Sequence, residues 1–108
     1  MKTTNGFMLF GFFRGMVYKH CDEEFEKYKE FRNSISKNAV IKHIESLDDA
    51  ITSIHAKDIF TGEDLGNAGL YDDGPFRFPI DFLHYYKNHD IGIPDEYERY
   101  LMEEIGLE

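Results

Sequence analysis

The chain of 108 residues has only one cysteine, Cys21, and no tryptophan. A single cysteine cannot form an intramolecular disulfide, which predicts a protein of a reducing compartment. No stretch reaches the roughly 18 apolar residues of a membrane span. Arg14 interrupts the apolar run of residues 7–13, and no small-residue cleavage site follows it. We therefore expect a buried element rather than a secretion signal, and a cytoplasmic protein.

Motifs that assemble catalytic or metal-binding groups are also missing. The histidines lack the spacing of three or four residues that suits a metal pair on one helix; His84 and His89 are five apart. No glycine-rich loop leads into Lys-Ser or Lys-Thr, so no phosphate-binding loop is expected. Cys21 precedes a predicted helix N-terminus, which would lower its thiol pKa, but a lone cysteine beside one histidine is weak support for a nucleophile. We predict no metal, no cofactor and no enzymatic activity.

Acidic residues are absent from residues 1–21, whose Lys2, Arg14 and Lys19 give a charge of +3. Residues 22–108 hold all 21 acids against the nine remaining Lys and Arg (12 minus 3), giving −12, and the sum is the net charge of −9. A field of this sign repels nucleic acid and anionic lipid and attracts basic partners. We therefore expect no direct contact with nucleic acid or membranes. Solubility alone is the alternative explanation of the acidity.

The spacing of apolar residues predicts helices in the first half of the chain. Residues 7–20 are predicted as a helix, with a buried strand as the alternative because a short apolar run fits both. Asp22 is a suitable N-cap for a helix over residues 22–36. Shorter helices are predicted over residues 38–44, capped by Asn38, and over residues 47–59.

The second half combines turn signals with two further helices. The turn Asp72-Asp73-Gly74-Pro75 lies between aromatic residues and predicts a short β-hairpin. Pro79 and Pro94 suit the first turns of helices over residues 79–88 and 94–105. The expected architecture is one domain, residues 1–108, that is mainly α: a small helical domain with one short β-hairpin. An α+β fold is the alternative.

Tyrosines mixed with acids are the most distinctive feature of the C-terminal half. Tyrosine supplies rigid contact area and carboxylates complement Lys and Arg, so this mixture suits an interface with a basic protein. The competing interpretation places the tyrosines at the edge of the core and the acids in solvent. The candidate partner-binding residues are Glu63, Asp64, Tyr71, Asp72, Asp73, Asp95, Glu96 and Tyr97.

Four phrases in this half carry a resemblance to a known family. They are F-T-G-E at residues 60–63, G-L-Y-D-D-G at 69–74, F-P-I-D-F-L-H-Y-Y at 78–86 and I-P-D-E-Y-E-R-Y-L at 93–101. Together they resemble small bacterial immunity proteins, particularly those paired with contact-dependent growth-inhibition toxins. The resemblance implies a cytoplasmic inhibitor that binds the C-terminal domain of its cognate toxin, often a nuclease, and covers its active site. Such families share no single binding surface, so it assigns no contact residue.

Two other functions remain open from the residues alone. A small ligand-binding module or enzyme would use a pocket lined by Tyr85, Tyr86 and Tyr97. A structural interaction module or homodimer would expose a large apolar patch, for example over residues 7–13. The sequence leaves the choice between monomer and dimer undetermined.

Overall fold

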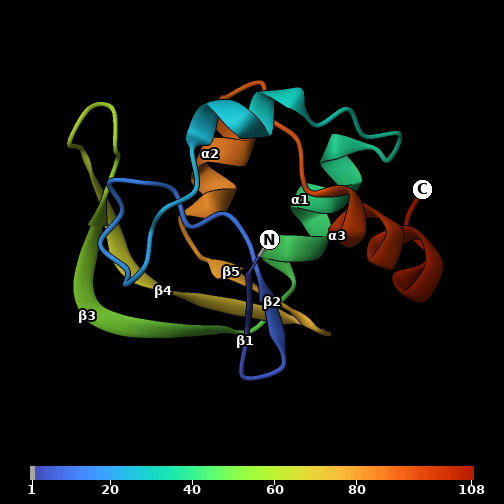
Figure 1. Ribbon diagram of the computed structural model, residues 1–108, viewed down its shortest axis with the longest axis horizontal. Coiled ribbons are helices and arrows are strands. Elements are labelled where there is room, and N and C mark those ends of the chain that lie inside the picture. The colour runs from blue at the N-terminus through green and yellow to red at the C-terminus, as the bar shows by residue number, and fades with distance from the viewer. Residues whose placement is uncertain (1) are drawn as a thin grey trace.

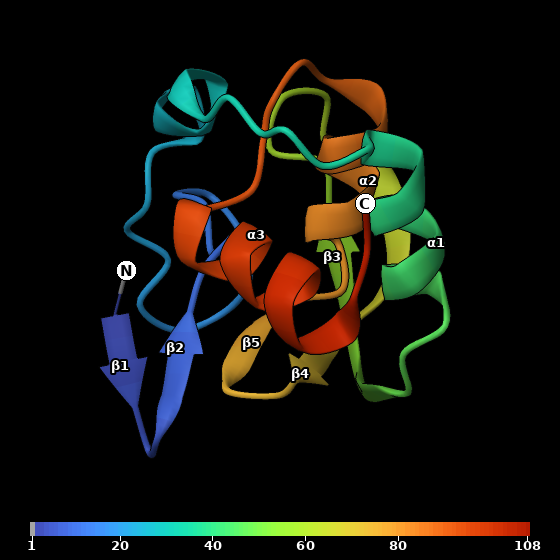
Figure 2. The same ribbon diagram turned by 90° about the vertical axis from the view of Figure 1, so that its right-hand side faces the viewer.

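The protein folds into a five-stranded mixed sheet with its helices gathered on one side (Figures 1 and 2). The structure is a computed structural model that describes residues 2–108. Its strands stand in the order β1-β2-β5-β4-β3; β2 and β5 are parallel, and the other neighbours are antiparallel. The strands are β1 (Lys2–Thr4), β2 (Phe7–Leu9), β3 (Asp49–Lys57), β4 (Asp64–Asp73) and β5 (Phe76–Pro79). The helical segments are the 3₁₀-helix η1 (Phe25–Glu30), α1 (Lys37–Glu45), α2 (Phe82–Asn88), α3 (Asp95–Tyr100) and the π-helix η2 (Leu101–Ile105).

The prediction of a mainly α protein is wrong, and the α+β alternative is confirmed, because strand makes up 29% and helix 31% of the chain. The largest error concerns residues 47–59, predicted as a helix. Most of this segment is β3, which pairs along β4, for example Ala50 with Leu70. Leu47, Ile51 and Ile54 do recur at helical spacing. The β-branched residues of the segment, however, favour an extended chain once a neighbouring strand is present.

The predicted helix over residues 22–36 is also wrong, because only η1 forms within it. Glu23, which lies within that predicted helix, instead forms hydrogen bonds that hold the preceding loop. One carboxylate oxygen accepts the Phe12 backbone N–H at 3.1 Å, and the other accepts the Tyr28 hydroxyl at 2.8 Å. That hydroxyl also accepts the Gly11 N–H at 2.8 Å. These bonds satisfy the backbone N–H groups of residues 11 and 12, which the predicted helix over residues 7–20 would have paired internally.

The predicted helix over residues 7–20 is wrong as well: residues 7–9 form β2, a strand as in the alternative but only partly buried, and turns follow it. After residue 36, the elements other than β3 come closer to the predictions. Helix α1 forms, but Ser36 rather than Asn38 is its N-cap, its Oγ accepting the Ala39 N–H. The hairpin forms from β4 and β5, α2 begins after Pro79 has ended β5, and α3 with η2 reaches Gly106.

Aromatic side chains fill the space between the sheet and the helices. Phe10, which directly follows β2, is fully buried. Its ring stacks on Phe78 of β5 at 4.7 Å between centroids and meets Phe82 of α2 edge-on at 5.3 Å. Tyr97 of α3 lies 4.9 Å from the same ring. Offset and edge-on aromatic pairs of this kind stabilise a core beyond simple burial, so one residue links the sheet to two helices.

None of the helices in residues 2–108 is both long and apolar enough to cross a bilayer.

Candidate functional site

A buried hydrogen-bond network at Asp73 fixes the position of α3. Asp73 ends β4, and its Oδ2 accepts the Tyr97 hydroxyl at 2.7 Å and lies 2.8 Å from His43 Nε2 on α1. Burial raises the pKa of Tyr97 well above its usual range, and the nearby charge of Asp73 raises it further. The network thus joins the hairpin, α1 and α3 in one arrangement.

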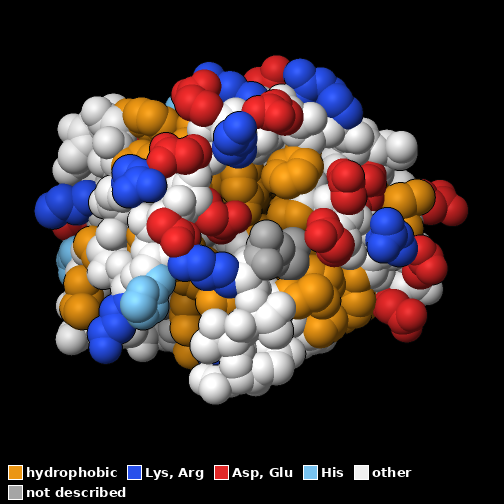
Figure 3. Space-filling view, viewed as in Figure 1, with side chains coloured by type: hydrophobic (Ala, Val, Ile, Leu, Met, Phe, Trp, Pro, Cys, Tyr) orange, Lys and Arg blue, Asp and Glu red, His pale blue; other side chains and the backbone are white. Residues whose placement is uncertain are grey.

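An acidic face results from this anchoring. Tyr97 and Leu101 are fully buried, so the opposite side of α3 and η2 faces outward. Five acids against the single cation Arg99 give residues 95–105 a charge of −4 (1 minus 5). The acids are Asp95, Glu96, Glu98, Glu103 and Glu104. Figure 3 shows acidic side chains over this end of the molecule, with apolar surface next to them.

Within the acidic face, Glu98 has an internal structural role. Its Oε2 accepts the backbone N–H groups of Ser34 and Ile35, at 2.6 and 3.0 Å. These bonds tie the chain that precedes α1 to α3. The other four acids of the face are exposed and remain available to a partner. Glu103 keeps 66% of its side chain exposed and lies 4.0 Å from the Arg99 guanidinium, at the limit of an ion pair.

A shallow groove of about 520 Å³ runs between this face and the hairpin. Its apolar lining comes from strand and turn residues as well as from α3, and its rim is acidic. The lining residues are Met8, Pro75, Phe76, Glu96, Arg99, Tyr100, Glu103 and Glu104. An apolar floor with carboxylates along the rim can hold the aliphatic stem of a Lys or Arg side chain and pair with its charge.

The eight residues proposed from the sequence do not form one surface. Asp64 and Asp72 lie at opposite ends of β4, eight residues apart, which places them roughly 26 Å from each other along an extended strand. Glu63 is exposed next to Asp64. Asp64 accepts the Gly66 N–H and pairs with His55, and both interactions lower its pKa. These acids at the far end therefore belong to a separate part of the surface.

Three of the eight residues are buried: Tyr71, Asp73 and Tyr97, at 8%, 4% and 0% exposure. They present almost no surface to a partner and act inside the fold. Asp72 is exposed, but both of its carboxylate oxygens bond the Arg77 guanidinium, at 2.6 and 2.9 Å, which lowers its pKa. Its charge is largely neutralised by that cation.

Asp95 and Glu96 are the two proposed residues that lie on the acidic face. Sequence reasoning missed the contributions of Glu103, Glu104 and the apolar floor. The adjacent acids at 103 and 104 are visible in the sequence as a pair. Their position in the predicted helix over residues 94–105, which also contains Asp95 and Glu96, could have indicated that they belong to the same surface. The approach of Met8 to the groove was not visible, because it depends on the parallel pairing of β2 with β5.

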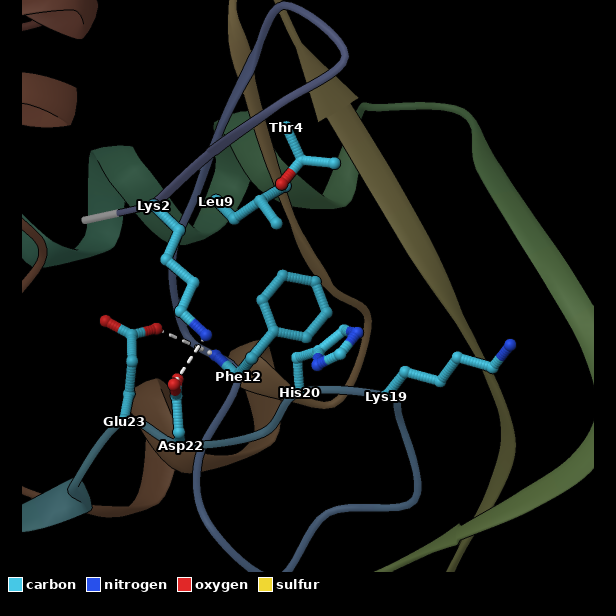
Figure 4. A pocket seen from close by; sticks show the side chains of 8 residues that line it. All are labelled: Lys2, Thr4, Leu9, Phe12, Lys19, His20, Asp22 and Glu23. Carbon is cyan, nitrogen blue, oxygen red and sulfur yellow. Dashed lines mark hydrogen bonds and ion pairs between the residues drawn. The ribbon is translucent and has the colours of Figure 1, made fainter.

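A second hollow, of about 280 Å³, opens beside β1 and β2 (Figure 4). Two of its charged side chains pair with each other, and a third bonds the backbone. Lys2 Nζ lies 2.5 Å from Asp22 Oδ2, and Glu23 accepts the Phe12 N–H. Lys19 extends away from these groups in the same view.

The three tyrosines of the pocket considered from the sequence are internal in the part of the chain that the structure describes. Tyr85 and Tyr97 are fully buried, and Tyr86 is 2% exposed. The Tyr85 hydroxyl accepts the Ile59 N–H at 2.9 Å, and the Tyr97 hydroxyl donates to Asp73 Oδ2. Within residues 2–108, no group of three His, Cys, Asp or Glu side chains is arranged to hold a metal ion.

No family model, curated protein or solved structure matches this chain.

Proposed function

We propose that this protein is an immunity protein: a stoichiometric, cytoplasmic inhibitor that binds a basic toxin domain, of nuclease type, through the acidic face of α3 and η2. The observation that supports this proposal most directly is the groove beside α3. Its apolar floor includes Met8 and Phe76, and its rim is formed by Glu96, Glu103 and Glu104. The resemblance of residues 60–101 to immunity proteins of contact-dependent growth-inhibition systems points to the same class.

The physical argument rests on charge complementarity. A nuclease domain binds phosphates and therefore presents Lys and Arg around its active site. A face with a charge of −4 on two helical segments offers those cations an alternative to the polyanion. The apolar floor adds contact area that is independent of salt. Binding would cover the substrate surface of the toxin and exclude nucleic acid.

The first test is capture of the partner. A tagged copy of the chain is purified from its native lysate at low and at high salt, and the co-eluting polypeptides are identified by mass spectrometry. We expect one basic polypeptide at near one-to-one stoichiometry, with less of it recovered at high salt because exposed charges are screened. Absence of any basic polypeptide at low salt would contradict the proposal.

The second test maps the surface with the captured partner. Glu96→Lys combined with Glu103→Lys should slow association by about ten-fold or more, since the rim charges that attract the partner are reversed. Glu26→Lys with Glu30→Lys on η1 is the matched control: it changes the net charge equally, at carboxylates 73% and 72% exposed. An equal loss in both pairs would mean that only net charge matters, and no loss in the first pair would reject the groove.

A further inference from the structure

The outer strand β3 is the feature that the proposed function leaves unexplained. It forms one edge of the sheet, and of its nine residues only Ala56 is buried. Ile51 and Ile54 are exposed at 62% and 59%, the highest values among the large apolar side chains described. An exposed edge strand offers unpaired backbone groups to another strand. The apolar patch that the alternative of an interaction module or homodimer would place over residues 7–13 does not include Phe10 and Phe13, because both are fully buried.

The neighbouring strand shows which way the backbone of β3 points. Gly69 of β4 uses its N–H to bond the Tyr18 hydroxyl and its C=O to accept the Ile80 N–H, so both groups face β5. Ile51 lies opposite Gly69 in the β3–β4 register. In an antiparallel pair, residues that do not bond each other direct their backbone groups outward. The N–H and C=O of Ile51 therefore point to the open edge.

The pairing of β3 with β4 is irregular at two points, and the first of them divides the edge into two short flanks. The register shifts between Ile51 and His55, where the Thr52 hydroxyl donates to the Ala68 C=O at 3.1 Å, and again between Ala56 and Lys57. A bulge prevents an uninterrupted strand from pairing along the whole edge. Residues 49–51 and 55–57 lie on either side of the first shift, and the second shift lies within the latter flank, next to Lys57.

These two flanks are complementary to each other in charge. Asp49 stands at one end of β3 and Lys57 at the other, and neither has an ion-pair partner among residues 2–108. An antiparallel second copy, related by a twofold axis at Ser53, would place residues 49–51 of each copy opposite residues 55–57 of the other. Asp49 would then face Lys57 twice, and the bulge would lie on the axis.

We propose that β3 is a homodimer interface, in which a second copy of this chain adds antiparallel to the open edge and joins the two sheets. The exposed isoleucines come under cover at this contact. Figure 1 shows β3 and α3 at opposite ends of the molecule, so the dimer leaves both acidic faces free for partners. The proposal is independent of what binds there. A single strand pair lies at the small end of protein interfaces, so the dimer is concentration-dependent.

Sedimentation equilibrium on the purified full chain tests the proposal over roughly a hundred-fold range of concentration. We expect a monomer–dimer equilibrium that Asp49→Lys weakens by about ten-fold, because two like-charged pairs replace two opposite ones. Combining Asp49→Lys with Lys57→Asp should restore dimerisation, since the reversed charges again face each other. A strictly monomeric wild type, or a double variant no better than the single one, would overturn the proposal.

A second pair of variants tests the apolar part of the interface. Ile54→Lys should weaken the dimer, whereas Val17→Lys, at a side chain 46% exposed outside the sheet, should leave it unchanged. Circular dichroism confirms that each variant is folded. Equal effects of the two changes would contradict the assignment to β3. A monomeric chain in which Ile54→Lys abolishes capture of the toxin would also contradict the proposal, because the toxin and not a second copy would then bind the edge of β3.

Discussion

Tyr97 and Asp73 are joined by a hydrogen bond of 2.7 Å that lies inside the protein, between the phenol hydroxyl and carboxylate Oδ2. Tyr97→Phe removes this donor and leaves a buried carboxylate with one close partner fewer. We expect the free energy of unfolding to fall by about 1–3 kcal/mol in urea titrations. Tyr71→Phe is the control, because its hydroxyl bonds no residue in the described part of the chain; its effect should stay within about 0.5 kcal/mol. Equal losses of unfolding free energy in the two variants would show that the bond to Asp73 does not stabilise the protein.

Asp81 provides a prediction about pH. It is buried before α2, its Oδ1 lies 2.7 Å from the Tyr18 hydroxyl, and its Oδ2 has no hydrogen-bond partner within residues 2–108. Burial raises its pKa, although the bond from Tyr18 opposes part of the rise. Because the pKa of Asp81 is higher in the folded chain than in the unfolded chain, its protonation favours the folded state. This contribution to stability is fully present below the unfolded-state pKa of about 3.9 and is lost as pH rises through the folded-state pKa.

Asp81→Asn should therefore raise the free energy of unfolding at neutral pH, on the order of 1 kcal/mol, because the variant avoids a buried charge. The gain should shrink in urea titrations at successively lower pH. Asp72→Asn is a control of opposite sign, since the pKa of Asp72 is lowered by Arg77. It should destabilise by up to about 1 kcal/mol at neutral pH, with the effect fading as pH falls. An Asp81→Asn gain that does not depend on pH would contradict the buried charge as its cause.

Gly74 lies where the β4–β5 turn meets α3. Its φ of 56° is in the left-handed region, and a Cβ added there would collide with the Tyr100 hydroxyl. Gly74→Ala should cost about 2–3 kcal/mol, since backbone strain and the displacement of Tyr100 add together. Gly62→Ala is the control: φ is 77°, but nothing lies within 4 Å of the added Cβ. Thermal unfolding that gave equal losses would show that Tyr100 moves without cost.

Cys21 is expected to react slowly. It is partly buried, its thiol donates to the Tyr18 C=O at 3.2 Å, and burial raises its pKa. The predicted helix start that would have lowered this pKa does not exist, since the next helical segment begins at Phe25. Alkylation by iodoacetamide should be at least about ten-fold slower in the folded chain than in urea at the same pH. Glutathione in both solutions controls for the solvent, and equal rates would contradict a protected thiol.

Sequence signals gave correct predictions where neighbouring residues alone decide the conformation, as in turns and at helix ends. Asp72 to Pro75 form a turn in any context that allows them, and the hairpin was predicted from them. Pro94 at the start and Gly106 at the end of the last helical region marked its limits correctly. The acids of this region could be read as surface groups, which predicted the exposure of Asp95 and Glu96 but not the groove beside them.

The sequence by itself determined the acidic charge, the aromatic content of the core, the hairpin and the C-terminal helical region, because composition and turn chemistry act locally. Tertiary structure decided that residues 49–57 form a strand, that Tyr97 and Asp73 are internal, and that Met8 reaches the groove. Each of these depends on pairing between segments distant in sequence: β3 with β4, Asp73 with α3, and β2 with β5. An apolar run of several residues suits a helix or a strand about equally, and the partner that buries it makes the choice.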